Sequence, residues 1–303
     1  MNALNVMNFF RDFCKVYPGK PLSDEEKKKR LYHFTSFDTF VKIWLTKRLR
    51  FGMIPKVNDI QEYLKNLSST PERLPLLFAL QDIISSYRQI SFTMDYDSFI
   101  KGCMSPTMWA HYGNKRQGVC LEFDYSKLNF PPNSVTRCIN YVPNLPYNYE
   151  LPNNLHCIND IKQFVNDNSD DLFFTKANEW SIENEFRIIC NTSEYMDVRN
   201  AITTIYLTSF DSLECILSEQ LVGDSVPVKY VHFVRTPDNI AVPVVSETRK
   251  EREMYTKANN NENNVLSDIL DKARKHYEIN KHDENANLIM KDDYNVNKIR
   301  TTT

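Results

Sequence analysis

The chain changes from a strand pattern to a helical one at Leu31-Tyr32-His33-Phe34-Thr35-Ser36-Phe37. The apolar and aromatic side chains of residues 31–35 predict a strand, and Ser36 is a typical N-cap for a following helix. Apolar residues then recur at helical spacing up to Leu45, and residues 49–54 predict a second strand. This strand-helix-strand order is typical of α/β architecture.

Working outward from this stretch, further apolar runs predict a sheet. Strands are predicted at residues 90–94, 118–123, 138–142, 185–190, 203–207, 228–234 and 240–245. Helices are predicted at 71–87, 105–112, 158–165 and 212–221, whereas 57–69 and 143–154 indicate loops. We expect 138–142 to pair beside 118–123. Residues 28–247 are therefore predicted to form an α+β domain with a mixed, largely antiparallel sheet, continuous or split, and inserted helices.

The two ends of the chain differ from this domain. Residues 1–27 predict an amphipathic first helix, with Leu4, Met7 and Phe10 at helical spacing, and a solvated linker. Residues 248–303 contain no Gly, Pro, Cys or Trp and are rich in Asn, so little apolar surface drives them into a core. We expect this polar tail to be helical or disordered, and to offer a binding segment to a protein partner.

The composition limits the classes of function. A chain of 303 residues with 42% hydrophobic side chains can bury a sizeable core, and a net charge of -2 gives no overall field that attracts nucleic acid or an anionic membrane. The sequence contains no run of about 18 apolar residues, and its first residues lack the pattern of a signal peptide. We therefore expect a soluble, cytoplasmic protein without a membrane partner.

Cysteine and glycine usage argue against several kinds of cofactor site. The seven Cys residues are dispersed without a Cys-x-x-Cys pair, which predicts reduced thiols and no structural zinc site. The six Gly residues form neither a P-loop nor a Gly-x-Gly-x-x-Gly turn, so a P-loop NTPase or a Rossmann enzyme is not expected. No metal is expected.

Charged residues gather in the segment Trp180-Ser181-Ile182-Glu183-Asn184-Glu185-Phe186-Arg187. If Glu185 begins a strand, Glu183, Glu185 and Arg187 share one face of it. That face is either a surface ion-pair ladder or the lining of a polar cleft. In a cleft, a carboxylate can stabilise positive charge that develops on a sugar carbon, and this chemistry needs no metal.

Two other segments supply candidate partners for these carboxylates. His33 lies in the middle of the first predicted strand, where a single imidazole is ordinarily a half-buried strand residue. Trp109 and Tyr112 lie about one helical turn apart, just before Gly113. They form either a core-facing pair or a stacking surface for a planar ligand.

Four motifs, in order, resemble a widespread family of functionally uncharacterised bacterial proteins. They are Leu-Tyr-His-Phe-Thr-Ser (31–36), Val-Asn-Asp (57–59), Met-Trp-Ala-His-Tyr-Gly with Gly-Val-Cys-Leu-Glu-Phe-Asp (108–124), and a segment at 175–189 that contains Glu-Trp-Ser-Ile-Glu-Asn-Glu-Phe-Arg. The resemblance spans about residues 31–207. It implies no activity by itself.

An early strand His, a middle aromatic and a late strand Glu are also similar to the His-Tyr-Glu arrangement of ADP-ribosyltransferases. That resemblance implies a split sheet that holds NAD, as substrate, in a cleft. It implies that His33 holds the ribose of the nicotinamide half, with Thr35 and Ser36 as further binding residues. Tyr112 or Trp109 would then pack against the nicotinamide.

The same resemblance assigns roles to the charged segment. Glu185 would bind the ribose 2′-hydroxyl and stabilise an oxocarbenium-like transition state while nicotinamide leaves. Glu183 would orient the acceptor, and Arg187 would pair with the carboxylates or with a phosphate.

Three functions remain as expectations. The first is an NAD-consuming ADP-ribosyltransferase or NAD glycohydrolase, acting as a bacterial toxin or anti-phage effector, with protein, nucleic acid or water as acceptor. The second is a metal-dependent nuclease that uses Glu183, Glu185 and Asp residues. The third is a non-catalytic ligand-sensing or assembly module whose polar tail recruits a partner.

Overall fold

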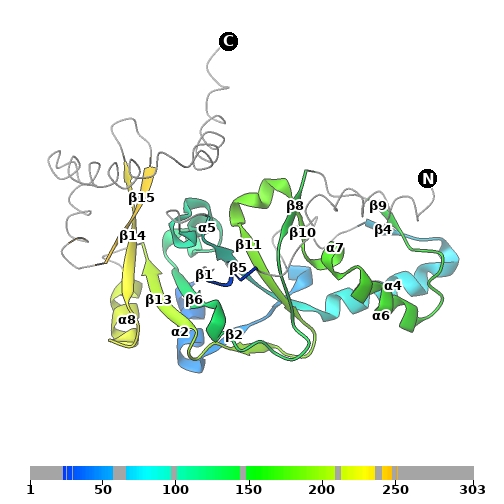
Figure 1. Cartoon of the computed structure of the whole chain (residues 1–303), viewed down its shortest axis with the longest axis horizontal. Helices are drawn as coiled ribbons and strands as arrows, with labels where there is room; N and C mark the ends of the chain where they lie inside the picture. Colours follow the sequence, from blue (N-terminus) through cyan, green and yellow to red (C-terminus); the bar gives the residue numbers. More distant parts are fainter. Residues whose placement is uncertain are drawn as a thin grey trace, which may run out of the picture. The chain divides into compact units, whose positions relative to one another are not determined.

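A computed structural model describes residues 23–24, 26–28, 30–56, 66–96, 101–143, 148–208, 213–235, 241–247 and 251 (Figure 1). The chain divides into two compact units, Met1–Val231 and His232–Thr303. The helix expected near the N-terminus and nearly all of the expected polar tail lie outside the described residues. The domain boundaries expected at residues 27 and 248 stay predictions.

Strands supply most of the regular structure in the described part of the chain. They are β1 (Arg30–Thr35), β2 (Arg48–Arg50), β3 (Gly52–Met53), β4 (Asn66–Ser68), β5 (Arg88–Met94), β6 (Val119–Asp124), β7 (Val135–Cys138), β8 (Asn140–Val142), β9 (Asn148–Glu150), β10 (Thr175–Ala177), β11 (Glu185–Cys190), β12 (Tyr195–Asp197), β13 (Ile202–Leu207), β14 (Val228–Arg235) and β15 (Ala241–Ser246).

Helices connect these strands, and short 3-10 turns flank them. The α-helices are α2 (Phe37–Thr46), α4 (Leu74–Ser86), α5 (Pro106–His111), α6 (Ile158–Asp167), α7 (Ser169–Phe173) and α8 (Leu213–Val222). The 3-10 turns are η1 (Glu26–Lys28), η2 (Ile54–Lys56), η3 (Pro71–Arg73), η4 (Gly102–Met104), η5 (Asn114–Arg116), η6 (Tyr125–Lys127) and η7 (Asn178–Glu183).

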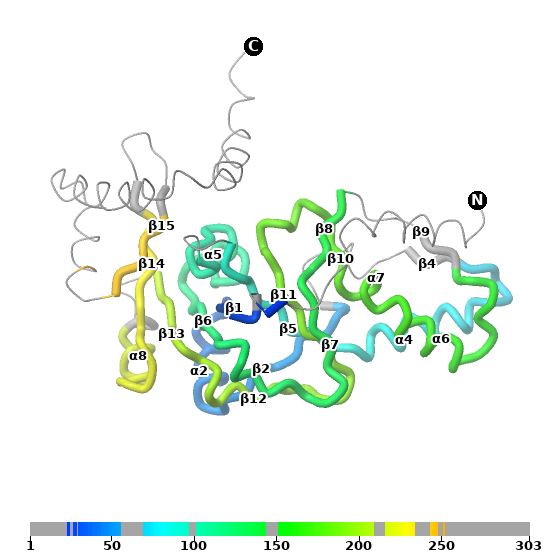
Figure 2. Tube along the Cα trace, in the orientation of Figure 1, coloured from blue at the N-terminus to red at the C-terminus, as the bar shows by residue number. Residues whose placement is uncertain are grey.

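One sheet dominates the first unit. Its strands follow the order β14-β13-β6-β1-β5-β11-β7, and β3 also pairs with β5. The described pairs in this path are antiparallel, except that β13 and β14 run parallel. Figure 2 shows β6, β1, β5 and β11 together in the middle of the unit. The prediction of a mixed, largely antiparallel sheet with several helices is confirmed.

The second unit begins inside β14 and includes β15. Within it, His232 Nε2 lies 3.0 Å from Ser246 Oγ, and both residues are buried. This hydrogen bond gives each of the two buried side chains a polar partner in place of water.

Local signals explain the start of the fold. Ser36 Oγ accepts the Thr39 backbone N–H at 3.3 Å, which makes Ser36 the N-cap of α2 as predicted. Phe40, Ile43 and Trp44 on one face of this helix are buried in the core. The N-terminal part of the fold therefore follows from capping and apolar spacing alone.

The single strand expected at residues 49–54 is two short strands. β2 pairs with β12, whereas β3 pairs with β5. Between them, Phe51 is 1% exposed and donates its backbone N–H to Glu194 O at 3.0 Å. The chain changes its pairing partner at Phe51, and a continuous apolar run does not reveal such a change.

The pairing expected for residues 138–142 is wrong. Instead of lying beside β6, β7 pairs with β11, and β8 pairs in parallel with β10. The Ile139 N–H between them bonds to Glu185 O at 2.9 Å. Partner choice here depends on residues that are distant in the sequence, so the local pattern does not determine it.

Two segments expected as loops contain short strands. β4 and β9 pair in parallel where residues 57–69 and 143–154 indicated loops. Residues 57–69 lack alternation of apolar residues, so the sequence gives no signal of a strand there. In 143–154, Leu145, Tyr147, Tyr149 and Leu151 do alternate, but the frequent Pro and Asn residues favoured a loop.

Strand β11 carries charged residues into the interior. All six of its residues are buried. Phe186 and Ile188 belong to one apolar cluster, and Ile189 belongs to a second cluster that includes side chains of α4, α6 and α7. Because buried charges need partners, Glu185 and Arg187 on this strand indicate a constructed polar site.

Candidate functional site

Strands β1 and β5 pair over only part of their length. In the described register, the pairs are Leu31 with Met94 and Tyr32 with Thr93. The beginning of β5 pairs with β3 instead. Beyond Tyr32, β1 therefore separates from β5, and the sheet opens between the two strands.

His33 lies where the two strands separate. Its Nδ1 is 3.0 Å from Ser91 O. Because a carbonyl oxygen only accepts, Nδ1 carries the proton, and Nε2 of the neutral ring is an acceptor. Burial lowers the pKa of His33, although the hydrogen bond to Ser91 opposes this effect. The neutral imidazole is thus favoured near neutral pH.

A cavity of about 480 Å³ occupies this opening. Its described walls come from β1, residues 50–53, β5, α5, and the side chains Lys176, Glu183 and Glu185. The volume lies within the range of about 300–1,000 Å³ that is usual for small-molecule sites. The structure therefore brings His33, Tyr112 and the two predicted glutamates to one hollow.

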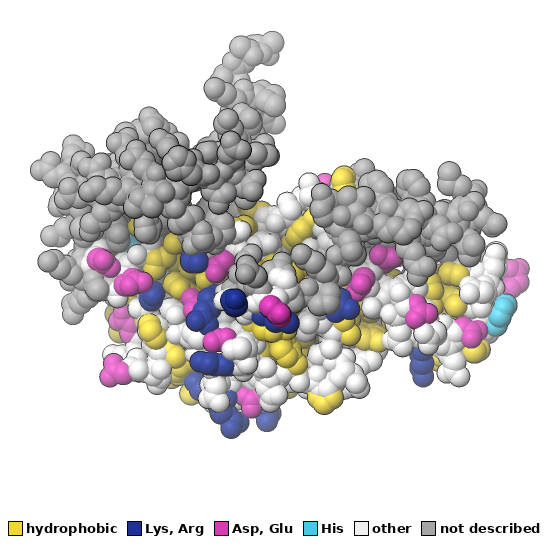
Figure 3. Space-filling model, viewed as in Figure 1, with side chains coloured by type: hydrophobic (Ala, Val, Ile, Leu, Met, Phe, Trp, Pro, Cys, Tyr) yellow, Lys and Arg dark blue, Asp and Glu magenta, His cyan; other side chains and the backbone are white. Residues whose placement is uncertain are grey.

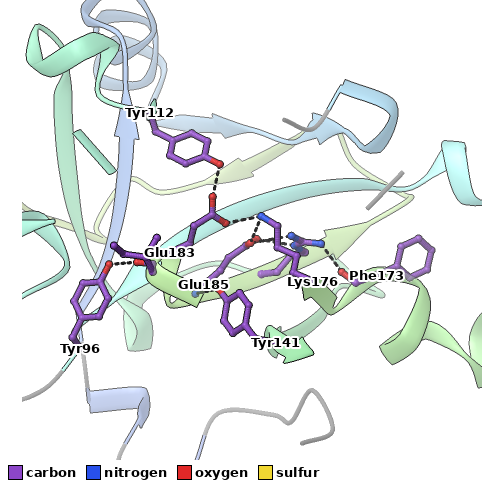
Figure 4. Close-up of polar contacts among 9 residues, drawn as sticks. Tyr96, Tyr112, Tyr141, Phe173, Lys176, Glu183 and Glu185 are labelled. Atoms are coloured by element: carbon purple, nitrogen blue, oxygen red, sulfur yellow. Dashed lines mark hydrogen bonds and ion pairs between the residues drawn. The ribbon is translucent and has the colours of Figure 1, made fainter. Parts of the chain in front are cut away.

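Lys176, a residue of β10, connects the two glutamates (Figure 4). Its Nζ lies 2.5 Å from Glu183 Oε2 and 3.3 Å from Glu185 Oε2. The side chains of Lys176 and Glu183 are each 6% exposed. The Tyr112 hydroxyl donates to Glu183 Oε1, which links α5 to the same cluster.

Arg187 holds Glu185 from within the same strand. Arg187 Nε donates to Glu185 Oε1 at 2.7 Å, and Nη2 donates to Glu185 Oε2 at 2.9 Å. Its Nη1 donates to Phe173 O at 2.6 Å. The Glu185 backbone N–H donates to the Tyr141 hydroxyl oxygen at 2.9 Å. This bidentate geometry is the strong form of an ion pair, and it fixes the Glu185 carboxylate.

The two carboxylates differ in what they can still accept. A carboxylate has about four acceptor sites. Glu185 receives two bonds from Arg187 and one from Lys176. Glu183 receives one from Tyr112 and one from Lys176. Glu183 therefore retains more acceptor capacity than Glu185.

Their pKa values move in opposite directions. Burial raises the pKa of Glu183, and Lys176 offsets this only in part. Burial also acts to raise the pKa of Glu185, but Arg187 and Lys176 outweigh it and lower this pKa to about 2. Two acids with separated pKa values are typical of sites in which one carboxyl group exchanges protons and the other stays charged.

Asn184 turns the chain between the two glutamates. Glu183 ends η7 and Glu185 begins β11, and Asn184 has a left-handed backbone with φ 42°. Its Nδ2 donates to Asp95 O at 3.1 Å and its carbonyl accepts the Met94 N–H at 3.0 Å. Glu183 thus lies before the strand, which begins at Glu185 as predicted, and this turn brings its carboxylate to Lys176 with that of Glu185.

Three other predicted binding residues serve the packing of the fold. Trp109 is fully buried, donates its Nε1–H to Cys103 O at 2.7 Å and packs edge-on against Phe34. Thr35 is 7% exposed within β1, and Ser36 caps α2. None of these three is among the described residues that line the cavity. Trp109 therefore has the core role, and its ring is not a stacking surface in this structure.

Lys176, Ser91, Tyr141 and Arg50 are site residues that the sequence analysis did not identify. Lys176 lies in the quoted motif at 175–189, and two acids separated by one residue at the start of a buried strand require a nearby cation. That requirement was a usable signal, but it does not say which lysine supplies the charge. Ser91 and Tyr141 belong to other strands, and the sequence does not show that these strands come close to Glu185.

Comparison with known proteins gives a family match for the middle of the chain. Residues 108–188 match a family model described as "Protein of unknown function (DUF2971)". This range includes Tyr112, Lys176, Glu183 and Glu185, and it supports the resemblance to an uncharacterised family. No curated protein matches the chain, and no solved structure does.

No group of three or more His, Cys, Asp or Glu residues in the described ranges is arranged to hold a metal ion. No helix in the part of the chain that the structure describes is long and apolar enough to cross a membrane.

Proposed function

We propose that this protein consumes NAD, as an ADP-ribosyltransferase or an NAD glycohydrolase, in the role of a bacterial toxin or anti-phage effector. One observation carries the proposal: His33, Glu183 and Glu185 line one ligand-sized cavity where β1 separates from β5. An opening between strands with an imidazole on one side and a carboxylate on the other resembles the cleft in which ADP-ribosyltransferases hold NAD.

The proposal gives each wall of the cavity a part in binding. His33 Nε2 accepts a hydrogen bond from a ribose hydroxyl of the nicotinamide half, because Nδ1 already donates to Ser91 O. Tyr112, the C-cap residue of α5, also lines the cavity and contacts the nicotinamide ring. Since its hydroxyl bonds to Glu183, Tyr112 holds the ring and the carboxylate in a fixed relation.

The chemical step is cleavage of the bond between ribose C1′ and the nicotinamide nitrogen. Nicotinamide leaves with the bonding electron pair, and C1′ becomes an oxocarbenium-like carbon. A buried carboxylate beside this carbon stabilises the positive charge and accepts a hydrogen bond from the 2′-hydroxyl group. Water or an acceptor group then attacks C1′ and releases one proton, which a nearby carboxylate receives.

The acceptor count favours Glu183 for direct contact with the ribose. Glu185 already receives three hydrogen bonds from Arg187 and Lys176, so it acts in this proposal as a positioning residue. It holds Lys176, which in turn holds Glu183. The role that the sequence resemblance implied for Glu185 thus passes to its neighbour two residues earlier.

Release of nicotinamide from NAD tests the proposal. The purified protein is incubated with NAD, and nicotinamide is quantified by liquid chromatography. We expect Glu183→Gln to lower the rate at least about 100-fold, because it removes the negative charge that the transition state needs. Glu179→Gln is the matched control, since Glu179 is exposed in the same turn η7. Equal rates in the two variants would remove the assignment of Glu183.

A second candidate is a non-catalytic module that binds NAD or a related ligand. It is favoured by the pairing of both carboxylates with buried cations, because such pairs also serve a purely structural role. Saturable NAD binding without any nicotinamide release would support it. For the nuclease expected from the sequence, DNA or RNA cleavage that is sensitive to EDTA would be the supporting result.

A further inference from the structure

Arg50 is an exposed cation at the cavity, and it has no acid partner among the described residues. It is the last residue of β2 and lines the cavity. Its side chain makes no ion pair or hydrogen bond within the part of the chain that the structure describes. Arg88 of β5, in contrast, pairs with Glu194 at 2.8 Å. A guanidinium exposed at a cavity wall in this way is available to a ligand.

The charges farther inside the cavity are already balanced. Lys176 and Arg187 face Glu183 and Glu185, and all four side chains are 6% exposed or less. Burial lowers the pKa of His33, which favours its neutral form. The exposed Arg50 therefore contributes net positive charge at the exposed side of the site, whereas the inner side offers hydrogen-bond acceptors.

This polarity matches a ligand that has hydroxyl groups at one end and an anion at the other. We infer that Arg50 binds a phosphate of the substrate, so that the site takes a phosphate-bearing nucleotide in preference to the nucleoside. The inference rests on the proposed function and specifies its substrate class. The planar guanidinium can donate two parallel N–H bonds to phosphate oxygens, a geometry that lysine does not offer.

Arg48 provides a matched control on the same strand. Leu49 between the two arginines is 2% exposed, so Arg48 and Arg50 project from the same side of β2. Both arginines are exposed, but only Arg50 is among the described residues that line the cavity. In Figure 3, Lys and Arg side chains gather at the lower edge of the visible face, in the region of α2 and β2. A general electrostatic effect of this region would act through both arginines alike.

The test measures binding and turnover with paired ligands. Binding of ADP-ribose to the full chain is measured by calorimetry for the wild type, Arg50→Gln, Arg50→Lys and Arg48→Gln. Turnover is measured with NAD and with nicotinamide riboside, which has the same glycosidic bond and no phosphate. Arg50→Gln should weaken ADP-ribose binding and raise the KM for NAD at least about tenfold, as expected for loss of a charged hydrogen-bond pair.

The remaining combinations of variant and ligand should show unchanged or intermediate binding and turnover. Nicotinamide riboside turnover should stay within twofold in Arg50→Gln, and Arg48→Gln should resemble the wild type with every ligand. Arg50→Lys should fall between, because it keeps the charge and loses the paired donors. Thermal unfolding of each variant shows whether the fold is retained.

The outcomes separate this inference from the proposed function. If NAD is cleaved and Arg50→Gln behaves like Arg48→Gln, the inference is wrong and the proposed function stands. If the wild type binds ADP-ribose in an Arg50-dependent way but releases no nicotinamide, the inference stands and the proposed activity fails. Absence of ADP-ribose binding to the wild type would overturn the inference.

Discussion

Lys176 and Glu183 form a buried ion pair, with 2.5 Å between Nζ and Oε2 and both side chains 6% exposed. The pair connects a short strand, β10, to the end of η7. Because both side chains are largely buried, each stabilises the charged form of the other. Most of the expected behaviour of the site follows from this mutual stabilisation.

Replacement of Lys176 by Met should destabilise the protein strongly. The change leaves two carboxylates close together without their shared cation, and removal of one partner of a buried pair costs about 3–5 kcal/mol. Urea unfolding at neutral pH measures this loss. Lys162→Met is the control, since Lys162 is exposed on α6 and should change stability by less than about 0.5 kcal/mol. Equal stability of both variants would show that Lys176 is not needed to neutralise the pair.

Stability should fall as the pH falls below that at which an ordinary Glu titrates. The pKa of Glu185 is lowered from 4.5 to about 2, so the folded state favours its ionised form, and the benefit is complete only above the unfolded pKa. The shift corresponds to about 3 kcal/mol, which is lost progressively between about pH 5 and pH 2. Glu183 acts in the opposite sense, because its raised pKa means that stability falls as the pH rises through that value.

Urea unfolding of the wild type and of Glu185→Gln at a series of pH values measures this contribution. Gln does not titrate, so the stability difference between the two proteins should shrink as the pH falls from about 5 to about 3. A difference that stays constant over that interval would contradict the lowered pKa.

Substrate binding should weaken as His33 becomes protonated. Its pKa is lowered by burial, so the neutral ring persists to a lower pH than for an ordinary His. Protonation removes the Nε2 lone pair that accepts the ribose hydroxyl. The Kd for NAD should therefore rise in the wild type only at a pH below that at which an ordinary His titrates, and it should stay nearly constant in His33→Gln. A parallel pH dependence in both proteins would assign the effect to another group.

Gly118 should tolerate no side chain. A Cβ atom at this position would lie 2.1 Å from Thr35 O, a backbone atom of β1 that cannot move away without distorting the sheet. We expect Gly118→Ala to reduce the free energy of unfolding by about 1–3 kcal/mol. Gly52→Ala is the control, because the nearest atom to a Cβ there is Gln89 O at an ordinary 3.5 Å. Thermal or urea unfolding of both variants makes the comparison.

The sequence was sufficient for elements whose signals are local. The strand at 31–35, the Ser36 cap and the buried strand from Glu185 follow from side-chain pattern and capping chemistry. Pairing was less accessible, because a run such as 138–142 has the same pattern whichever strand it joins. The split of 49–54 at Phe51 depends on a backbone bond to Glu194, far along the chain.

The candidate site was predictable in its charged residues and less so in its geometry. The two glutamates and His33 were identified from residue type and order, and the structure places all three at one cavity. The left-handed turn at Asn184 could not be foreseen from alternation, because that rule assumes an unbroken strand. Lys176 and Arg50 come to the site from other strands, so only the tertiary fold reveals them.

The central claim is that His33 and Glu183 act on one ribose, and a double-mutant cycle on nicotinamide release from NAD tests it most directly. The rates are measured for the wild type, His33→Gln, Glu183→Gln and the double variant, with Glu179→Gln as control. The account predicts that the double variant is little slower than Glu183→Gln alone, because residues that serve the same transition state are strongly non-additive. Independent, multiplicative losses, or a wild type that releases no nicotinamide, would contradict it.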